Sequence, residues 1–467
     1  MAPTVISTED AVSALNWARR VFGHIELSDQ RLVTRSVQVA AHFAARPKDS
    51  IPHACGKPAD TKGTYRFLEN KRVTSEALIK SITQATATAC TGAAVIYAVQ
   101  DTTTFNFSTL MGTVGLGPIG DGPARGIHLH STLALNAGGV PLGLLDLNFW
   151  TRKETRVPIP CRQRPIEEKE SYRWLQGASA VHTALASLPV PPRIIHVEDR
   201  EGDIHEFFAH IQRLGDGAVI RCGQNRCVAG AVDRAHAAVH NSPCLGQTTL
   251  KLRRTPKRAA RIALVEIRAT KVTLQPSNKY PGHQPLELTL VEVWEPAPPS
   301  EDERIVWRLW TTEPANTLAE ALEVVRIYKQ RWRVEDVHLA AKSGCDVENL
   351  QLETVPRLKK ALSIYMAVAV RIVALRGLLQ EQPDQPCTVI FTPLEWRLLW
   401  SWKKRLPCLP ECPVPTLREA AMWLGQLGGH LGRKSDGLPG IRTLWRGWRD
   451  LHLLIEGQKL HPGLNRS

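Results

Sequence analysis

The stretch Tyr328-Lys-Gln-Arg331-Trp-Arg-Val-Glu335-Asp-Val-His-Leu-Ala-Ala-Lys342 decides how this chain is interpreted. On a helix that turns about 100° per residue, Arg331, Glu335 and Lys342 project within about 40° of one another. Tyr328 lies slightly further round the same side. One carboxylate, two cations and a phenol therefore share a helix face, which indicates half of an active site.

We predict that these residues lie on one continuous helix. Thr317 and Glu320 form a capping box at its start, and Ser343-Gly344 provides its end. Apolar residues at helical spacing run beside the charged face and would seat the helix on a core. They are Ile327, Val334, Val337 and Ala341.

The size and charge of the chain narrow the class of protein. Its 467 residues suffice for about two to four domains, each with its own core. A hydrophobic fraction of 43% and a charged fraction of 22% are typical of soluble globular proteins. The net charge of +14 favours a polyanionic partner, most often nucleic acid, although charge alone leaves a merely basic protein as the alternative.

Cysteine spacing and hydropathy predict a cytoplasmic protein without a membrane span. The ten cysteines include no CxxC pair, so we interpret them as reduced, mostly structural thiols and do not favour zinc at Cys408 and Cys412. The N-terminus lacks the pattern of a signal peptide. The longest apolar run, about 362–379, contains Arg371 and Arg376 and suits a buried core helix.

The first 70 residues are predicted to form small polar helices. Arg31 and Arg35 lie four residues apart on a helix that begins near Asp29, and Arg66 follows a glycine turn. Exposed arginines on small helices suit contacts with phosphates. A solvated charged face is the alternative.

Residues 92 to 221 alternate between short apolar runs and helical segments, which predicts an α/β core. Ala94–Val99 would be a buried strand closed by Asp101, and Arg193–Asp199 a second strand ending in an acid. From about 225 to 311 alternating strands joined by basic loops, such as Arg253–Arg258, predict an inserted β subdomain.

The C-terminal part is predicted to be helical. A core helix near 355–380 and a linker at Pro383–Pro393 precede a tryptophan-rich region from about 394 to 467. Aromatic residues at this density suit an interface, or equally a small self-contained core.

Three acids stand out by position. Asp101 and Asp199 lie at the ends of predicted core strands, and a helix packed across the sheet could bring Glu335 to them. Converging carboxylates repel one another unless cations lie between them, so Mg²⁺ or Mn²⁺ is the natural ligand. Two such ions support phosphodiester displacement. For either aspartate alone, a strand-end turn residue is the alternative.

These residues carry a resemblance to a known family. Asp101 in Gln-Asp-Thr-Thr-Thr, Asp199 in Val-Glu-Asp-Arg-Glu-Gly-Asp-Ile-His and Tyr328-x2-Arg331-x3-Glu335-x6-Lys342 resemble bacterial DDE transposases of the IS4 group, whose Tyr-Arg-Glu-Lys (YREK) signature has this spacing. The similarity covers nearly the whole chain, including Asn16-Trp-Ala-Arg, Tyr65-Arg-Phe and Trp445-Arg-Gly-Trp.

The resemblance implies an RNase H-like core, a mixed sheet flanked by helices. Residues 71–380 would form this core, with the β subdomain inserted at about 225–311. Helical domains would bind DNA at 1–70 and dimerise at 381–467. The reaction would be cut-and-paste transposition of an insertion sequence: nicking, hairpin formation by the new 3′-OH, hairpin opening, and strand transfer into target DNA. A bacterial, nucleoid-associated location is implied.

The resemblance also implies a role for each site residue. Asp101, Asp199 and Glu335 would ligate two Mg²⁺ ions, and Mn²⁺ could substitute. Trp307 would stack a flipped base during hairpin formation. Other residues would bind DNA: Arg31, Arg35 and Arg66 the transposon end, Arg221 phosphates near the core, and Tyr328, Arg331 and Lys342 phosphates near the cleavage point. Cleavage would occur in trans, within a homodimer holding two double-stranded ends.

The sequence also departs from the family. Leu339 and Gln351 stand where basic residues are expected, so some hairpin-strand contacts and the preference for an end sequence should differ. Cys345 and Asp346 replace small residues past the end of the predicted helix. Two other functions stay open: a catalytically silent end-binding or inhibitory protein, and a stand-alone RNase H-like nuclease. The intact acids argue against the first, and a plain nuclease would not need the N-terminal arginine helices.

Overall fold

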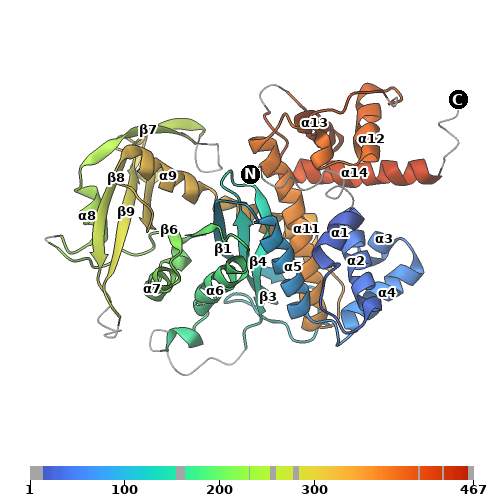
Figure 1. The fold of residues 1–467 in the computed structure, drawn as a ribbon, viewed down its shortest axis with the longest axis horizontal. Helices are drawn as coiled ribbons and strands as arrows, with labels where there is room; N and C mark the ends of the chain where they lie inside the picture. Colours follow the sequence, from blue (N-terminus) through green and yellow to red (C-terminus); the bar gives the residue numbers. More distant parts are fainter. Residues whose placement is uncertain are drawn as a thin grey trace.

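The computed structural model describes residues 14–153, 164–230, 232–252, 259–276, 283–408, 411–433 and 436–460. A mixed sheet runs through the molecule and helices cover both of its faces (Figure 1), which confirms the α/β class. The predicted basic loop at 253–258 lies outside the described residues.

Helices and strands alternate along most of the chain. The helices are α1 (Ala14–Phe22), α2 (Gln30–Ala45), α3 (Ile51–Cys55), α4 (Pro58–Glu69), α5 (Ser75–Ala89), α6 (Tyr172–Ala186), α7 (His205–Leu214), α8 (Ala235–His240), α9 (Leu318–Lys329), α10 (Trp332–Leu339), α11 (Val355–Glu381), α12 (Pro393–Lys404), α13 (Leu417–Leu427) and α14 (Ile441–Leu460). The strands are β1 (Val95–Asn106), β2 (Gly117–Pro118), β3 (Arg125–Leu135), β4 (Pro141–Trp150), β5 (Arg193–Glu198), β6 (Gly217–Arg221), β7 (Cys244–Leu252), β8 (Arg261–Leu274), β9 (Leu286–Trp294) and β10 (Val306–Thr311).

The strands form one ten-stranded sheet in the order β2-β3-β1-β5-β6-β10-β9-β8-β7, with β4 beside β3. Strands β1, β5 and β6 pair in parallel, and the remaining pairs are antiparallel. The strands expected of an inserted subdomain, β7 to β9, continue this sheet through β10. No break in hydrogen bonding separates them from the core strands within the described residues.

Both faces of the sheet are buried at β6, because neighbouring residues of a strand point to opposite sides and helices pack on each side. Ala218 and Ile220 of β6 pack with Phe207 of α7. Val219, between them, joins the larger core that includes Val324 of α9. Helices α6 and α7 thus cover one face, and α9 to α11 the other.

Helix α11 lies between the sheet and the N-terminal helices (Figure 1). The ring of Phe43 in α2 stacks on Tyr365 in α11, with centroids 4.4 Å apart. The buried Lys360 ammonium of α11 donates to the carbonyls of Leu68 and Asn70, at the end of α4, at 2.9 Å. The N-terminal helices are therefore fixed to the helix that also seats α10.

Helix α11 is also the apolar run noted in the sequence. Among the described residues it alone is long and apolar enough to cross a membrane, but 72% of its most apolar window is buried inside the protein. This burial agrees with the prediction of a core helix.

The segment predicted as one helix consists of three consecutive pieces. The capping box of Thr317 and Glu320 starts α9 as predicted. After α9 ends at Lys329, the amide of Arg331 donates to the carbonyl of Tyr328 at 3.0 Å, an i→i−3 bond that tightens the chain before α10. The single-helix prediction is therefore wrong here, because one local hydrogen-bond shift interrupts the pattern.

A π-helical turn, Ala340–Gly344, follows α10 directly. Turns of this kind are rare and often lie at functional sites. The tightened step and the π turn both change the helical phase, so the angles expected for a uniform helix do not apply to Lys342. That side chain is placed by the π turn.

The C-terminal helices α12 to α14 form a small core of their own. Trp396, Trp423 and Trp448 are nearly fully buried in it, with Phe391 stacked on Trp448. These tryptophans therefore serve as a local core rather than an exposed interface. The predicted linker is tied to this region, because the amide of Cys387 donates to the carbonyl of Pro415 at 2.9 Å.

Candidate active site and nucleic-acid interface

Asp101 and Asp199 lie side by side on neighbouring strands. Strands β1 and β5 are parallel with Val99 opposite Val197, so the two aspartates, each two residues further on, are level. Adjacent strands are separated by about 4.8 Å. Asp199 follows β5 directly, as predicted, and its carboxylate accepts from the amide of Glu201 at 2.8 Å.

Asp101 itself does not close a strand. Strand β1 continues to Asn106, because its antiparallel pairing with β3 persists after its pairing with β5 has ended. Asp101 thus lies just beyond the point where β1 stops pairing with β5, while β1 still pairs with β3. The predicted strand end was wrong, but the predicted neighbourhood of the two acids is correct.

Helix α10 brings Glu335 to these strands. It packs on β1, and the ring of His338, one turn after Glu335, lies over the strand. The Nε2 atom of His338 is 2.9 Å from the hydroxyl of Ser131, and its Nδ1 atom is 3.6 Å from a carboxylate oxygen of Asp101. Burial lowers the pKa of His338 to about 3, so the ring is neutral at physiological pH.

Glu335 forms an ion pair with Arg331, the residue that precedes α10. Arg331 donates to the carboxylate of Glu335 at 2.5 Å, and the Arg331 side chain is only 7% exposed whereas that of Glu335 is 42% exposed. A nearly buried guanidinium thus partly neutralises the acid cluster, and the glutamate keeps an open side toward solvent.

The three acids influence one another electrostatically. Burial raises the pKa of Asp101 to about 7, and the charges of Asp199 and, more weakly, Glu335 add to this rise. Arg331 opposes it. A cation bound here would favour the ionised form of Asp101, against the burial and the neighbouring negative charges that raise its pKa.

Donor chemistry at this site fits a hard divalent cation. Three carboxylates offer only oxygen atoms, the ligands that Mg²⁺ and Mn²⁺ prefer. In the described residues no three His, Cys, Asp or Glu side chains lie close enough to hold a metal as they stand. Because Glu335 is turned to Arg331, its carboxylate would have to leave that pair to become the third ligand.

A buried polar layer lies behind the aspartates and was missed in the sequence. Gln100 donates to Glu198 at 2.7 Å, and its carbonyl oxygen is 2.9 Å from His130. The other ring nitrogen of His130 is 2.9 Å from the hydroxyl of Thr102. Gln100 and Thr102 flank Asp101 in the sequence, and Glu198 precedes Asp199, so one connected hydrogen-bond network adjoins both acids. Their position next to the two acids was the only signal in the sequence for this network.

Trp307, Tyr328 and Arg221 form a second cluster. The rings of Trp307 and Tyr328 meet edge to face, with centroids 6.1 Å apart. The guanidinium of Arg221 lies 6.0 Å from the Trp307 ring, and its Nη2 donates to the carbonyl of Val306 at 2.6 Å. Trp307 is only partly buried, and it contacts Tyr328, whose pKa is raised by burial and, more weakly, by the charge of Asp199.

Lys342 projects from the π turn toward β1. Its ammonium lies 5.9 Å from the ring centre of Phe105, and burial lowers its pKa. The charges of Glu348 and Asp101 act in the opposite direction. The structure therefore brings Lys342, Tyr328 and Arg331 near the acids.

The predicted end-binding arginines lie apart from this site, on α2 and α4. Arg31 is 90% exposed and pairs with Asp29 at 2.8 Å, and Arg35 is 3.4 Å from Asp60. The expected glycine turn before Arg66 is absent: Gly63 lies inside α4, where a Cβ atom would be 2.7 Å from the Arg35 guanidinium.

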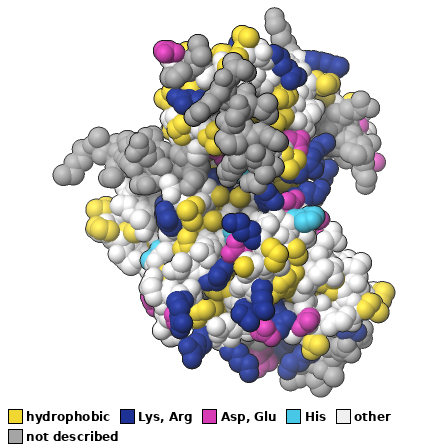
Figure 2. Space-filling model, turned by 90° about the vertical axis from the view of Figure 1, so that its right-hand side faces the viewer, with side chains coloured by type: hydrophobic (Ala, Val, Ile, Leu, Met, Phe, Trp, Pro, Cys, Tyr) yellow, Lys and Arg dark blue, Asp and Glu magenta, His cyan; other side chains and the backbone are white. Residues whose placement is uncertain are grey.

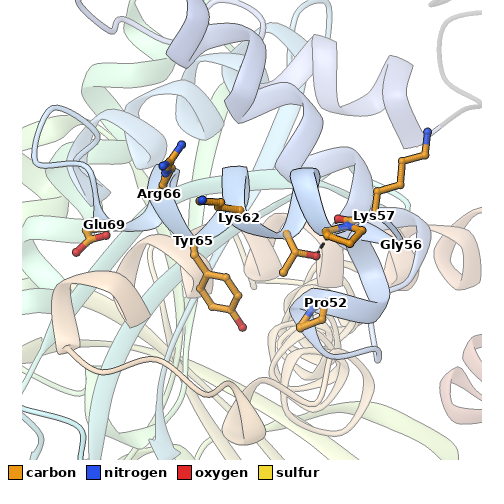
Figure 3. Close-up of a pocket in the computed structure, with 9 residues that line it drawn as sticks. Pro52, Gly56, Lys57, Lys62, Tyr65, Arg66 and Glu69 are labelled. Atoms are coloured by element: carbon orange, nitrogen blue, oxygen red, sulfur yellow. Dashed lines mark hydrogen bonds between the residues drawn. The ribbon is translucent and has the colours of Figure 1, made fainter.

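A pocket of about 710 Å³ lies beside Arg66 and was not predicted. Figure 3 shows Pro52 and Lys57 at one end, with Lys62, Tyr65 and Arg66 along α4. Lys and Arg side chains gather over this region of the surface (Figure 2). The four-residue spacing of Lys62 and Arg66 was the available signal for this basic surface.

Three family models match parts of the chain. Transposase DNA-binding matches residues 14–73 and the transposase DDE domain matches residues 228–371, which support a DNA transposase. The Transposase Tn5 dimerisation domain matches residues 367–464. Together they support a transposase that resembles the Tn5 enzyme, binds DNA and forms a homodimer.

The central sheet with its flanking helices is consistent with the RNase H-like fold of a DDE domain. The DDE match includes Glu335 but begins at residue 228, after both Asp101 and Asp199. The case for those two residues rests on their position in the sheet.

Proposed function

We propose that this protein is an active, Mg²⁺-dependent transposase of the IS4 group that cuts and pastes an insertion sequence. The observation that carries this proposal is the level placement of Asp101 and Asp199 on β1 and β5, with Glu335 on the helix packed against them. The matched transposase domains support the same class.

Asp101, Asp199 and Glu335 are the proposed ligands of two Mg²⁺ ions, with Mn²⁺ as a substitute. When bound, such ions supply an activated water or hydroxyl and stabilise the leaving oxygen. Glu335 would give up its pair with Arg331, which frees that guanidinium for a DNA phosphate. The Arg331 guanidinium, which pairs with Glu335 in this structure, would thereby bind the DNA substrate once the metal ions are bound.

Phosphate binding near the cut falls to Tyr328, Arg331 and Lys342. The depressed pKa of Lys342 reflects burial, and a phosphate would restore the favourable environment for its charge. Trp307 and its neighbour Arg221 would hold a base extruded during hairpin formation, by stacking and by phosphate contact.

The remaining residues are proposed to assemble the complex. Residues 1–70 would bind each transposon end through Arg31, Arg35 and Arg66. Residues 71–380 would form the core with its inserted strands at about 225–311, and residues 381–467 would join two copies. The complex would then insert the element into target DNA in the bacterial cytoplasm.

A cleavage assay on DNA carrying the element's ends tests the proposal. We expect nicking and hairpin formation with Mg²⁺. We expect Glu335→Gln to lower the rate of cutting by roughly 1000-fold or more, while end binding in a gel shift is retained. Glu287→Gln changes an exposed strand carboxylate and serves as the matched control. Cutting that survives Glu335→Gln would contradict the assigned third ligand.

The same assay separates the other functions. A silent end-binding protein would shift the DNA but not cut it with either Mg²⁺ or Mn²⁺. A plain nuclease would cut DNA that lacks the ends at a comparable rate.

A further inference from the structure

One buried histidine joins two parts of the proposed site. Asp101 of β1 and Ser131 of β3 are directly opposite in the antiparallel ladder, so their side chains lie on the same face of the sheet. The ring of His338 spans this pair, with Nε2 at 2.9 Å from the Ser131 hydroxyl and Nδ1 at 3.6 Å from an Asp101 oxygen. Ser131 is fully buried and the His338 side chain is 7% exposed.

The chemistry of these partners selects one tautomer. A bound cation would keep the Asp101 carboxyl ionised, and an ionised carboxylate only accepts hydrogen bonds, whereas a serine hydroxyl can donate or accept. A neutral ring between them is best satisfied when Nδ1 carries its proton toward Asp101 and Nε2 accepts from Ser131. The opposite tautomer would set a ring lone pair against the carboxylate.

The Nδ1 to oxygen separation of 3.6 Å exceeds a hydrogen bond. Contacts between working groups are often long until the reacting complex forms. His338 also lies three residues after Glu335, on the same short helix. The ring therefore links the strand of one proposed ligand to the helix of another.

We propose that His338 is a positioning residue that orients the Asp101 carboxylate and fixes the spacing between Asp101 and the helix of Glu335, with Ser131 setting its tautomer. This inference rests on the proposed function for the identity of the ligands. It assigns His338 no contact with DNA and no proton transfer.

Two amide substitutions separate positioning from simple packing. In His338→Asn the side-chain amide occupies the region of Nδ1 and can still donate to Asp101, whereas in His338→Gln the amide reaches toward Nε2. We measure Mn²⁺ binding to the full-length protein on end DNA by calorimetry, together with end binding and thermal unfolding. His128→Asn, which changes another buried histidine of β3, is the matched control.

We expect His338→Ala and His338→Gln to weaken Mn²⁺ binding by roughly 10-fold or more, the usual cost of losing a residue that orients a ligand. His338→Asn should recover most of this loss, and Ser131→Ala should weaken binding less than His338→Ala. End binding should be unchanged in all of them.

Equal Mn²⁺ affinity in the wild type and His338→Ala would overturn the proposal, as would an equal loss in His338→Asn and His338→Gln. A loss that simply follows the fall in melting temperature, with His128→Asn behaving alike, would also overturn it. If the wild type binds Mn²⁺ with this pattern but never cuts DNA, the proposed transposase activity fails and the role of His338 stands.

Discussion

At the scale of single residues, the protonation of Asp101 links stability to pH. In the folded protein its pKa is raised from 3.8 to about 7, chiefly by burial and by Asp199. Between these values the folded protein holds a proton that the unfolded chain has lost. Without metal, this group therefore makes the protein less stable as pH rises from about 4 to 7.

We expect Asp101→Asn, which cannot titrate, to be more stable than the wild type in EDTA at pH 8, by on the order of 2 kcal/mol. The difference should shrink toward pH 5, and Mg²⁺ should stabilise only the wild type. Urea unfolding at several pH values measures it. A difference that does not change with pH would mean that Asp101 lacks the raised pKa.

At the scale of elements, the π turn after α10 depends on one glycine. A Cβ atom at Gly344 would lie 0.8 Å from Cη2 of Trp445, which reaches it from α14. Since this turn also carries Lys342, a C-terminal helix directly supports the proposed phosphate-binding lysine.

We expect Gly344→Ala to lower the free energy of unfolding by about 3 kcal/mol, because the indole must be displaced. Gly440→Ala is the control, since its Cβ would meet open space. Adding Trp445→Leu to Gly344→Ala should cost less than the sum of the two single changes. Additive losses in chemical unfolding would show that the two side chains do not compete for this space.

Local signals in the sequence predicted local structure well. The capping box at Thr317 was visible as two residues at fixed spacing, and it starts α9 in the structure. The length of β1 beyond Asp101 was not visible, because it depends on pairing with β3, distant in sequence. The i→i−3 hydrogen bond between Arg331 and Tyr328, which separates α9 from α10, cannot be predicted from the spacing of apolar residues.

The candidate site was predictable to the same extent. Position after a strand identified Asp101 and Asp199 as candidates, but their level placement requires knowing that β1 and β5 are neighbours. His338 carries no signal of its own, since its partners Ser131 and Asp101 come from other strands. The roles of all these residues stay predictions until they are tested.

At the scale of the whole molecule, the N-terminal helices and the acid cluster are separate parts joined through α11. Lys360 holds the end of α4, and α11 continues to the C-terminal helices matched by the dimerisation model. Two copies joined at these helices could each present a DNA end to the other. The net charge of +14 favours bringing two DNA ends together.

Cleavage in trans can be tested by mixing two inactive variants. We expect Glu335→Gln to retain end binding but not to cut. We expect a variant with Arg31, Arg35 and Arg66 all changed to Ala to retain the acid cluster but to bind ends poorly. In a mixed dimer, the first copy holds an end and the second cuts it, so we expect single-end nicking to reappear in the mixture. If mixed dimers form in size-exclusion chromatography but no nicking returns, each copy cuts the end that it binds.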